Sequence, residues 1–377
     1  MDSADTTERE IEAAKRSELR NNLQGSVGRI DLSSIDSVES LKDLSFTDLN
    51  FDVQTGEAFM RGLETPLGDK TPPLTSIPRG VIGDVKRVMS KVLSVSRKLE
   101  SEGSKSANRF FVESSGCQFR VQKIQAIRGD SFTLRRTLQP PRLINIAGMS
   151  PIVRHCLWLI GNECSTGRMI LIAGKTSQGK SVTGFSILQE FLINAGNIGV
   201  SVEDPVEILM PEWYGKNRIG RLYQKQVVDD DMASAMRDAV RETPRWIMIG
   251  EIRDAVSAQL AINASINGHV VIGTTHAGDT LEAVARVLSL ASNGNVNSQQ
   301  AQTFAMGIAC VIHQSLFQNP DGFGKYVKQD CLFFGSEDAG PRDMIAAGKV
   351  PQLRSIVERQ RNLIENGKSP TKFKDMV

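Results

Sequence analysis

The hydrophobic pattern of the second half of the chain alternates between short apolar runs and stretches with helical spacing. The apolar runs are MILIAG, NIGVSVED, WIMIGE and HVVIGTTH, at residues 169–174, 197–204, 246–251 and 269–276. Helical spacing covers the segments between them, at residues 181–194, 232–243 and 255–267. Strand-like apolar runs separated by helices are typical of a parallel sheet covered by helices. We therefore predict an α/β domain in this half.

The first half of the chain shows a shorter period. Residues 44–59, LSFTDLNFDVQTGEAF, alternate apolar and polar positions and reach a Thr-Gly turn, which predicts a strand and a hairpin. Apolar residues then recur at helical spacing over residues 81–99, and two or three short alternating runs follow over residues 109–137. We expect a helix packed on a sheet.

Prolines mark the boundary between these two patterns. Gln139-Pro140-Pro141-Arg142 interrupts the periodicity, and Ser150-Pro151 interrupts it again, because proline fits neither a helix interior nor a central strand. A chain of 377 residues is long enough for two domains that each bury a core. We predict a polar arm at residues 1–27, a first domain at 28–140 and a second domain at 141–377 that ends in a helical segment.

Composition and charge exclude several classes of protein. Apolar residues make up 40% of the chain and charged residues 23%, which is typical of soluble globular domains. The net charge is only +2, so no global field draws the chain to nucleic acid, and we expect no direct nucleic-acid binding. The most apolar stretch, residues 304–312, is much shorter than the roughly 20 residues that span a bilayer, and the N-terminus lacks the order of a secretory signal. We expect a cytoplasmic protein with no transmembrane segment.

A phosphate-binding motif lies between an apolar run and a helical stretch of the second domain. The motif G-x-x-x-x-G-K-[ST] is matched by eight residues, which Val182 follows: Gly174, Lys175, Thr176, Ser177, Gln178, Gly179, Lys180 and Ser181. In such a loop, backbone N–H groups and a helix N-terminus bind a polyphosphate. Lys180 then reaches the terminal phosphates, and the Ser181 hydroxyl binds Mg²⁺. The motif in this context predicts nucleotide binding.

Two acidic clusters follow later strands of the same predicted sheet. They are Glu203-Asp204-Pro205-Val206-Glu207 and Gly250-Glu251-Ile252-Arg253-Asp254. Because the carboxyl ends of the strands line the ligand crevice of a doubly wound sheet, both clusters could face the phosphate-binding loop. NTPases of this kind need a carboxylate near the metal and a group that orients the attacking water. Asp254 is equally a candidate for a helix N-cap, which is a structural role.

Two histidines flank the last apolar run of the predicted sheet. His276 closes the run at its carboxyl end, where a side chain could sense a γ-phosphate. His269 begins the run, and this placement supports a functional role less. A single histidine in an apolar run is more often a core residue with satisfied hydrogen bonds than a ligand.

These segments together resemble the Walker A motif, Asp box, Walker B motif and His box of the type II/type IV secretion ATPases. The four boxes occur in the family's order, and the similarity covers about residues 44–355. The resemblance implies a RecA-like P-loop NTPase domain, preceded by a PAS-like α+β domain that begins near LSFTDLNFDVQTGEAF. It also implies that RDMIAAGKVPQL, at residues 342–353, belongs to a C-terminal segment like that of the pilus retraction motors.

The resemblance further implies roles for individual residues in the hydrolysis of ATP with Mg²⁺. Glu203 would act as general base on water, and Glu251 would assist the metal and the water. His269 and His276 would sense the γ-phosphate. Arginines of the first domain would close over the nucleotide, and those in the matching segments are Arg120, Arg128 and Arg136. A basic hairpin with a solvated face is the structural alternative for these arginines.

The sequence also departs from the family pattern, and it leaves alternatives open. Gln178 and Val182 replace the usual small residue and threonine, and the four-cysteine zinc module of type II exporters is absent. By resemblance we expect a hexameric ATP-hydrolysing motor of a type IV secretion, conjugal transfer or type IV pilus machine. Such a motor would be peripherally associated with proteins of an inner-membrane complex. A nucleic-acid translocase and a nucleotide-dependent assembly switch with negligible turnover are the alternatives.

Overall fold

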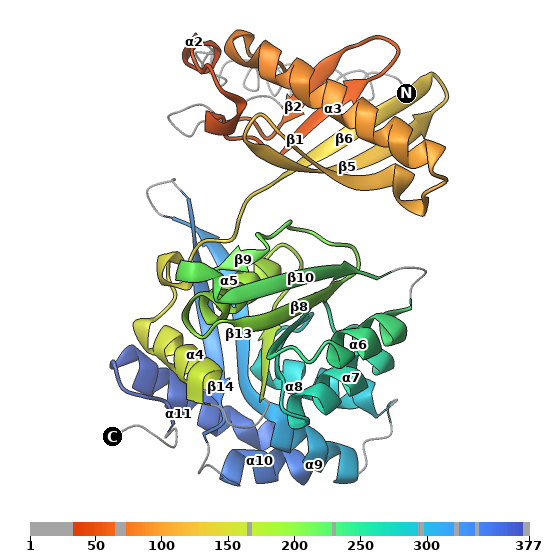
Figure 1. Ribbon diagram of the computed structural model, residues 1–377. Helices are drawn as coiled ribbons and strands as arrows, with labels where there is room; N and C mark the ends of the chain where they lie inside the picture. Colours follow the sequence, from red (N-terminus) through yellow and green to blue (C-terminus); the bar gives the residue numbers. More distant parts are fainter. Residues whose placement is uncertain are drawn as a thin grey trace, which may run out of the picture. The chain divides into compact units, whose positions relative to one another are not determined.

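A computed structural model gives the fold of most of the chain (Figure 1). It describes residues 33–64, 73–163, 168–227, 231–292, 294, 298–319, 324–335 and 339–371. The polar arm predicted at residues 1–27 lies outside the described residues. The chain divides into two compact units, Met1–Thr137 and Leu138–Val377.

The first unit is an antiparallel sheet with one long helix packed on it (Figure 1). Six strands lie in the order β3-β2-β1-β6-β5-β4, and the register confirms the hairpin predicted at residues 44–59. The helix predicted at residues 81–99 and the strands predicted at 109–137 are confirmed as well. The elements are α2 Ser33–Asp36, η1 Leu41–Asp43, β1 Asp48–Asp52, β2 Ala58–Arg61, β3 Thr75–Ser76, η2 Arg79–Val81, α3 Ile82–Ser101, η3 Lys105–Asn108, β4 Arg109–Ser114, β5 Cys117–Ala126 and β6 Gly129–Thr137.

The core of the first unit lies between α3 and one face of this sheet. Val85, Val88 and Val92 recur at helical spacing and are buried, so α3 presents a continuous apolar stripe. Phe119 on β5 and Leu134 on β6 belong to the same buried cluster. Burying each such side chain contributes roughly 1.5–3 kcal/mol to stability, which is what anchors this helix on the sheet.

The second unit contains one eight-stranded sheet in the order β14-β13-β7-β12-β11-β8-β10-β9. The six inner strands are parallel, and the edge strands β14 and β9 are antiparallel to their neighbours. The elements are η4 Leu143–Asn145, α4 Pro151–Glu163, β7 Arg168–Ala173, α5 Lys180–Asn194, β8 Asn197–Glu203, β9 Trp213–Tyr214, η5 Lys216–Arg218, β10 Gly220–Gln226, α6 Met232–Arg241, β11 Trp246–Ile249, α7 Ala255–Ile266, β12 Val270–Thr275, α8 Thr280–Ala291, α9 Ser298–Gly307, β13 Ile308–Gln318, β14 Lys325–Phe333, α10 Ala339–Ala346, η6 Val350–Leu353 and α11 Arg354–Glu365.

Helices cover both faces of this sheet, as the uniformly apolar strands predict (Figure 1). Along β7, Met169, Leu171 and Ala173 belong to the core that α6, α7, α8 and α9 complete. The alternate residues Ile170 and Ile172 belong to the core that α4 and α5 complete. Side chains alternate between the two faces of a strand, so β7 must be apolar throughout. The predicted α/β class is therefore confirmed.

The strand order gathers the motif-bearing segments at one edge of the sheet. β12 lies between β7, which precedes the phosphate-binding loop, and β11, which precedes the second acidic cluster; β8 follows next. Because these four strands are parallel, their carboxyl ends meet along one edge. Among the described residues, no helix combines the length and apolarity that crossing a membrane needs.

Candidate active site

The phosphate-binding loop connects the end of β7 to the start of α5. Three of its residues have positive φ: Gly174 at 153°, Ser177 at 62° and Gly179 at 74°. Gly179 is the N-cap residue of α5, and no side chain caps the helix there. The first N–H groups of an α-helix have no partner within the helix, so this terminus suits a polyphosphate. Lys175, Thr176 and Ser177 are exposed, whereas Val182 packs against the apolar core.

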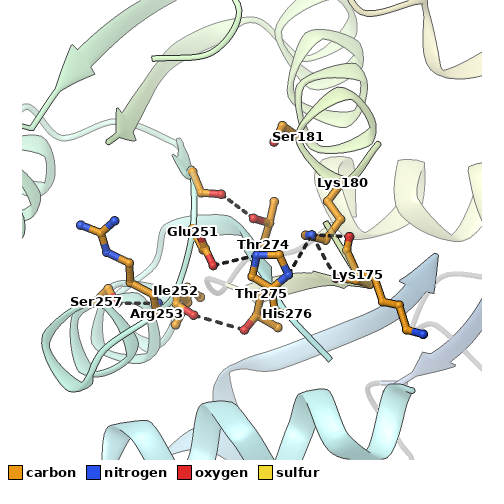
Figure 2. Close-up of polar contacts among 12 residues, drawn as sticks. Lys175, Lys180, Ser181, Glu251, Ile252, Arg253, Ser257, Thr274, Thr275 and His276 are labelled. Carbon is orange, nitrogen blue, oxygen red and sulfur yellow. Dashed lines mark hydrogen bonds and ion pairs between the residues drawn. The ribbon is translucent and has the colours of Figure 1, made fainter. Parts of the chain in front are cut away.

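Lys180 points back into the loop that it closes (Figure 2). Its ammonium group donates to Gly174 O and to Lys175 O, both over 2.9 Å. The residue is buried, and this burial lowers the pKa of the amine, an effect that the nearby carboxylates of Glu251 and Glu207 oppose. The loop therefore encloses a cation at the place where phosphate groups would lie.

His276 lies between Lys180 and Glu251 and contacts both of them (Figure 2). Its Nδ1 is 3.4 Å from Lys180 Nζ, and its Nε2 is 3.2 Å from Glu251 Oε1. A neutral imidazole with its proton on Nε2 satisfies both neighbours, since Nδ1 then accepts from the ammonium and Nε2 donates to the carboxylate. The side chains of His276 and Glu251 are 39% and 38% exposed, so a ligand can reach both.

Glu251 is held by the strand beside its own. Thr274, on β12, donates through Oγ1 to Gly250 O, and Thr274 O accepts from Ile252 N over 2.7 Å. Thr275 Oγ1 donates to Ile252 O over 3.1 Å (Figure 2). These three bonds fix both neighbours of Glu251 to the strand that carries His276. The backbone on both sides of Glu251 is therefore held in place by hydrogen bonds to β12.

Asp254 has the structural role that the sequence allowed. It is the N-cap residue of α7, and its side chain accepts from Ser257 N over 2.8 Å in a capping box. Arg253 donates to the Asp204 carboxylate over 2.5 Å and so connects the two acidic clusters. These contacts hold the carboxyl ends of β8 and β11 together.

Glu203 ends β8 and is the most enclosed carboxylate of the site. It is 2% exposed, and its Oε1 accepts from Ser201 Oγ over 2.6 Å and from Gln224 Nε2 over 3.0 Å. Burial raises the pKa of the Glu203 carboxyl to about 7, and these hydrogen bonds oppose the increase only in part. A carboxyl with this pKa exchanges its proton near neutral pH, which suits a general base.

Glu207 is a site residue that the motif analysis did not single out. Ser181 Oγ donates to Glu207 Oε2 over 2.9 Å, and Glu207 N donates to Glu203 Oε2 over 3.5 Å. Glu207 thus links the start of α5 to the general-base candidate. The signal in the sequence was its place as the last residue of EDPVE, but the turn that brings it to Ser181 could not be inferred from spacing.

His269 is not brought to the loop. It precedes β12 at the amino end, whereas His276 follows the carboxyl end, and seven residue steps at about 3.3 Å each place the two roughly 23 Å apart. Its Nδ1 lies 2.6 Å from Pro244 O. Within one chain, His269 therefore contacts the backbone at the amino end of the sheet and does not reach the phosphate-binding loop.

The three arginines belong to the first unit and have different surroundings there. Arg120 is half-buried on β5, and Arg128 is exposed in the turn between β5 and β6. Arg136 donates to Leu44 O and to Lys42 O, and its guanidinium also lies over an aromatic ring. Arg136 is thus bound within its own unit, whereas Arg128 is open to solvent.

The donor atoms around Ser181 are those that Mg²⁺ prefers. The Ser181 hydroxyl and the Glu207 carboxylate are in contact, and Glu251 supplies a second carboxylate near Lys180. No group of three or more histidine, cysteine, aspartate or glutamate side chains in the described part of the chain could hold a metal by itself. Mg²⁺ is typically bound by one or two protein oxygens together with phosphates and water, so these residues fit it.

The fold and the loop define a P-loop protein with a RecA-like parallel sheet. Residues 79–347 match the family model described as "Type II/IV secretion system protein". This match covers more than half of the chain, across both units. The chain belongs to the type II/IV secretion system protein family.

Individual relatives agree with this assignment. The type II secretion system protein HxcR of Pseudomonas aeruginosa is 37% identical over 122 residues, 32% of this chain and 24% of that protein. A twitching motility protein of Neisseria gonorrhoeae is 26% identical over 190 residues, 50% of this chain and 49% of that protein. The matched segments thus span between about a quarter and a half of the length of these relatives.

Two solved structures share the fold over most of the chain. The pilus retraction motor PilT with bound ADP matches with a TM-score of 0.63 and 22% identity, over 86% of this chain and 90% of that chain. The ATPase DotB of Legionella pneumophila matches with a TM-score of 0.54 and 20% identity, over 86% of this chain and 89% of that chain. At 22% and 20% identity, these matches show that the fold is shared.

Proposed function

We propose that this chain is an ATPase that converts hydrolysis into mechanical work in a secretion, conjugation or pilus machine. The observation that carries the proposal is the contact series Lys180–His276–Glu251, which three different segments build at the mouth of the phosphate-binding loop. Such a series of ionisable groups in contact marks a functional site. The family match and the names of the relatives support the kind of machine.

Each group has a chemical task in this proposal. Lys180 and the N-terminal amides of α5 bind the terminal phosphates of ATP. Ser181 and Glu207 or Glu251 would hold Mg²⁺, which would supply positive charge to neutralise the phosphate oxygens. Glu203 accepts the proton of the attacking water. His276 holds Glu251 and senses the terminal phosphate through its contact with Lys180.

The first unit contributes its arginines in this proposal. A guanidinium that approaches only when the units close would stabilise charge in the transition state and couple hydrolysis to movement. Arg120 and Arg128 are the better candidates, because Arg136 already binds two carbonyls of its own unit. A ring of six chains, docked on proteins of an inner-membrane complex from the cytoplasmic side, is the assembly that we propose by resemblance.

Phosphate release at saturating ATP and Mg²⁺ tests this function. We expect steady turnover that depends on protein concentration more steeply than linearly, since ring formation completes each site. Nucleotide binding without turnover in the assembled protein would instead identify an assembly switch. Stimulation of turnover by single-stranded or double-stranded DNA would identify a translocase, and we expect none at a net charge of +2.

A further inference from the structure

Gln314 lies where the phosphate-binding loop meets the strand beside it, although it belongs to none of the nucleotide-binding motifs. It is on β13 and is 1% exposed. Its Nε2 donates to Gln178 O over 2.7 Å. Its Oε1 accepts from Thr183 Oγ1 over 2.8 Å and from Gln329 Nε2 over 2.9 Å. One buried amide therefore binds the loop, the first turn of α5 and the neighbouring strand β14.

The loop also packs against the backbone and side chain of Gln314. A Cβ atom at Gly174 would collide with Gln314 O, and a Cβ atom at Gly179 would lie 3.3 Å from Gln314 Nε2. Both glycines have positive φ, which other residues rarely adopt. A larger residue at either of these two positions would therefore press against Gln314.

Gln178 makes the reciprocal contact from the loop to β13. The ladder between β13 and β7 ends at His313, but β13 continues. Leu316 pairs with Val327 on β14, and Val327 N donates away from β13, so Leu316 N points to the β7 side. Gln178 Oε1 accepts from Leu316 N over 2.6 Å. The Gln178 side chain takes the place that a further residue of β7 would have in the sheet.

We propose that Gln314 and Gln178 are positioning residues, which hold the loop at residues 174–181 in the conformation that binds phosphates. The inference rests on the proposed function, because it assigns these residues to the same nucleotide site. β13 lies on one side of β7, and β12, β11 and β8 lie on the other. The residues to which the proposed function assigns the activation of water and the sensing of phosphate, Glu203, Glu251 and His276, lie at the carboxyl ends of those three strands. Loosening the contact with β13 should therefore weaken nucleotide binding more than it slows hydrolysis at saturation.

Two variants of matched size test the proposal in the full chain. Gln314→Leu removes all three amide contacts, and Gln178→Met removes the bond to Leu316 N. We expect the dissociation constant of a fluorescent ADP with Mg²⁺ to rise about tenfold or more in Gln314→Leu and about threefold to tenfold in Gln178→Met. The KM for ATP should rise with it, while kcat stays within about threefold of wild type. Gln352→Met, at an exposed position in η6, is the control and should change neither constant.

The readouts separate a positioning role from a structural one. A purely structural role would lower the melting temperature of the free protein and leave nucleotide affinity unchanged well below that temperature. Gln178 is only half-buried, so its variant carries the test if Gln314→Leu does not fold. Affinities within about twofold of wild type in Gln178→Met, and in Gln314→Leu if it folds, would overturn the proposal. A wild type that binds no nucleotide would overturn the proposed function, and this inference with it.

Discussion

The two ends of the central sheet in the second unit carry similar side chains in different surroundings. At the amino ends, His269 and Arg245 each contact a backbone carbonyl, at 2.6 Å and 3.1 Å. At the carboxyl ends, His276 contacts both Lys180 and Glu251, and the side chains of His276 and Glu251 are partly exposed. A carbonyl contact ties a side chain to the fold, whereas ionisable groups in contact at the carboxyl ends of parallel strands are typical of a functional site. Position in the sheet, more than residue type, therefore distinguishes the candidate site residues from residues with a structural contact.

The largest effect on turnover should come from removing Glu203, the proposed general base at the carboxyl end of β8. Glu203→Gln keeps the shape of the side chain and an acceptor for Ser201 and Gln224 but cannot take a proton from water. We expect kcat for ATP to fall by about 100-fold or more, with the affinity for ATP within about twofold of wild type. Phosphate release and equilibrium binding measure the two quantities. Near-normal turnover would show that another group is the base, and Glu212→Gln, in an exposed ion pair, is the matched control.

The next effect should come from the imidazole at the carboxyl end of β12. His276→Ala removes the contacts to Lys180 and to Glu251, which leaves both groups less well placed. We expect kcat to fall by about tenfold to 100-fold, the range typical of residues that orient a ligand-binding group. Phosphate release at saturating ATP measures it. Unchanged turnover in this variant would mean that the contacts of His276 with Lys180 and Glu251, drawn in Figure 2, play no role in hydrolysis.

The pH dependence of hydrolysis should reflect the raised pKa of Glu203. Because the base must be ionised, kcat/KM should fall about tenfold for each pH unit below about 7 and level off above it.

The free energy of unfolding should depend on pH in the opposite direction and decrease as the pH rises. A carboxyl whose pKa is raised by folding stabilises the native state at acid pH, and this stabilisation is lost as the pH rises from its ordinary 4.5 to about 7.

Glu203→Gln also tests that assignment. Above pH 7 the variant avoids burying a carboxylate, so its free energy of unfolding in urea should exceed that of the wild type by up to about 3 kcal/mol. The difference should disappear near pH 4.5. Its residual turnover should also lose the pH dependence seen near 7, and a residual rate that keeps it would assign the titration to another group.

The smallest effect on turnover is expected at the amino end of the same strand. His269→Ala should leave kcat within about twofold of wild type, because His269 contacts a loop carbonyl rather than the site. The lost hydrogen bond should lower the free energy of unfolding by about 1 kcal/mol. Turnover reduced as strongly as in His276→Ala would show that His269 reaches a nucleotide, which within one chain it does not. Such a result would point to a site completed by a neighbouring chain.

Local patterns were sufficient to predict the strands and helices that carry the motifs. The apolar runs ending at residues 174, 204 and 251 and the helix at 181–194 all occur in the structure, because each signal depends on a few adjacent residues. No local pattern determines the order of the strands, and this order places His276 between Lys180 and Glu251. The phosphate-binding loop could also be predicted from adjacent residues, because the positive φ angles of its own backbone require glycine at residues 174 and 179.

Contacts between residues distant in sequence could not be predicted. The prolines at residues 139–142 and 150–151 were predicted to mark the boundary, yet Leu143, Ile146 and Met149, which lie between them, belong to the core of the second unit. Gln314 is 136 residues from Gln178, and no spacing rule relates them. Arg136 was selected by resemblance, but its binding to carbonyls near the start of its own unit depends on sheet pairing.

The central claim is that a polyphosphate binds in the loop that Lys180 closes. Equilibrium titration of the wild type and Lys180→Ala with ATP and Mg²⁺, followed by calorimetry, tests it most directly. We predict one ATP per chain for the wild type and an affinity weakened by about 100-fold or more in Lys180→Ala, since a buried ammonium that contacts phosphate is lost. Equal affinity in the two proteins would contradict the claim and place the nucleotide elsewhere.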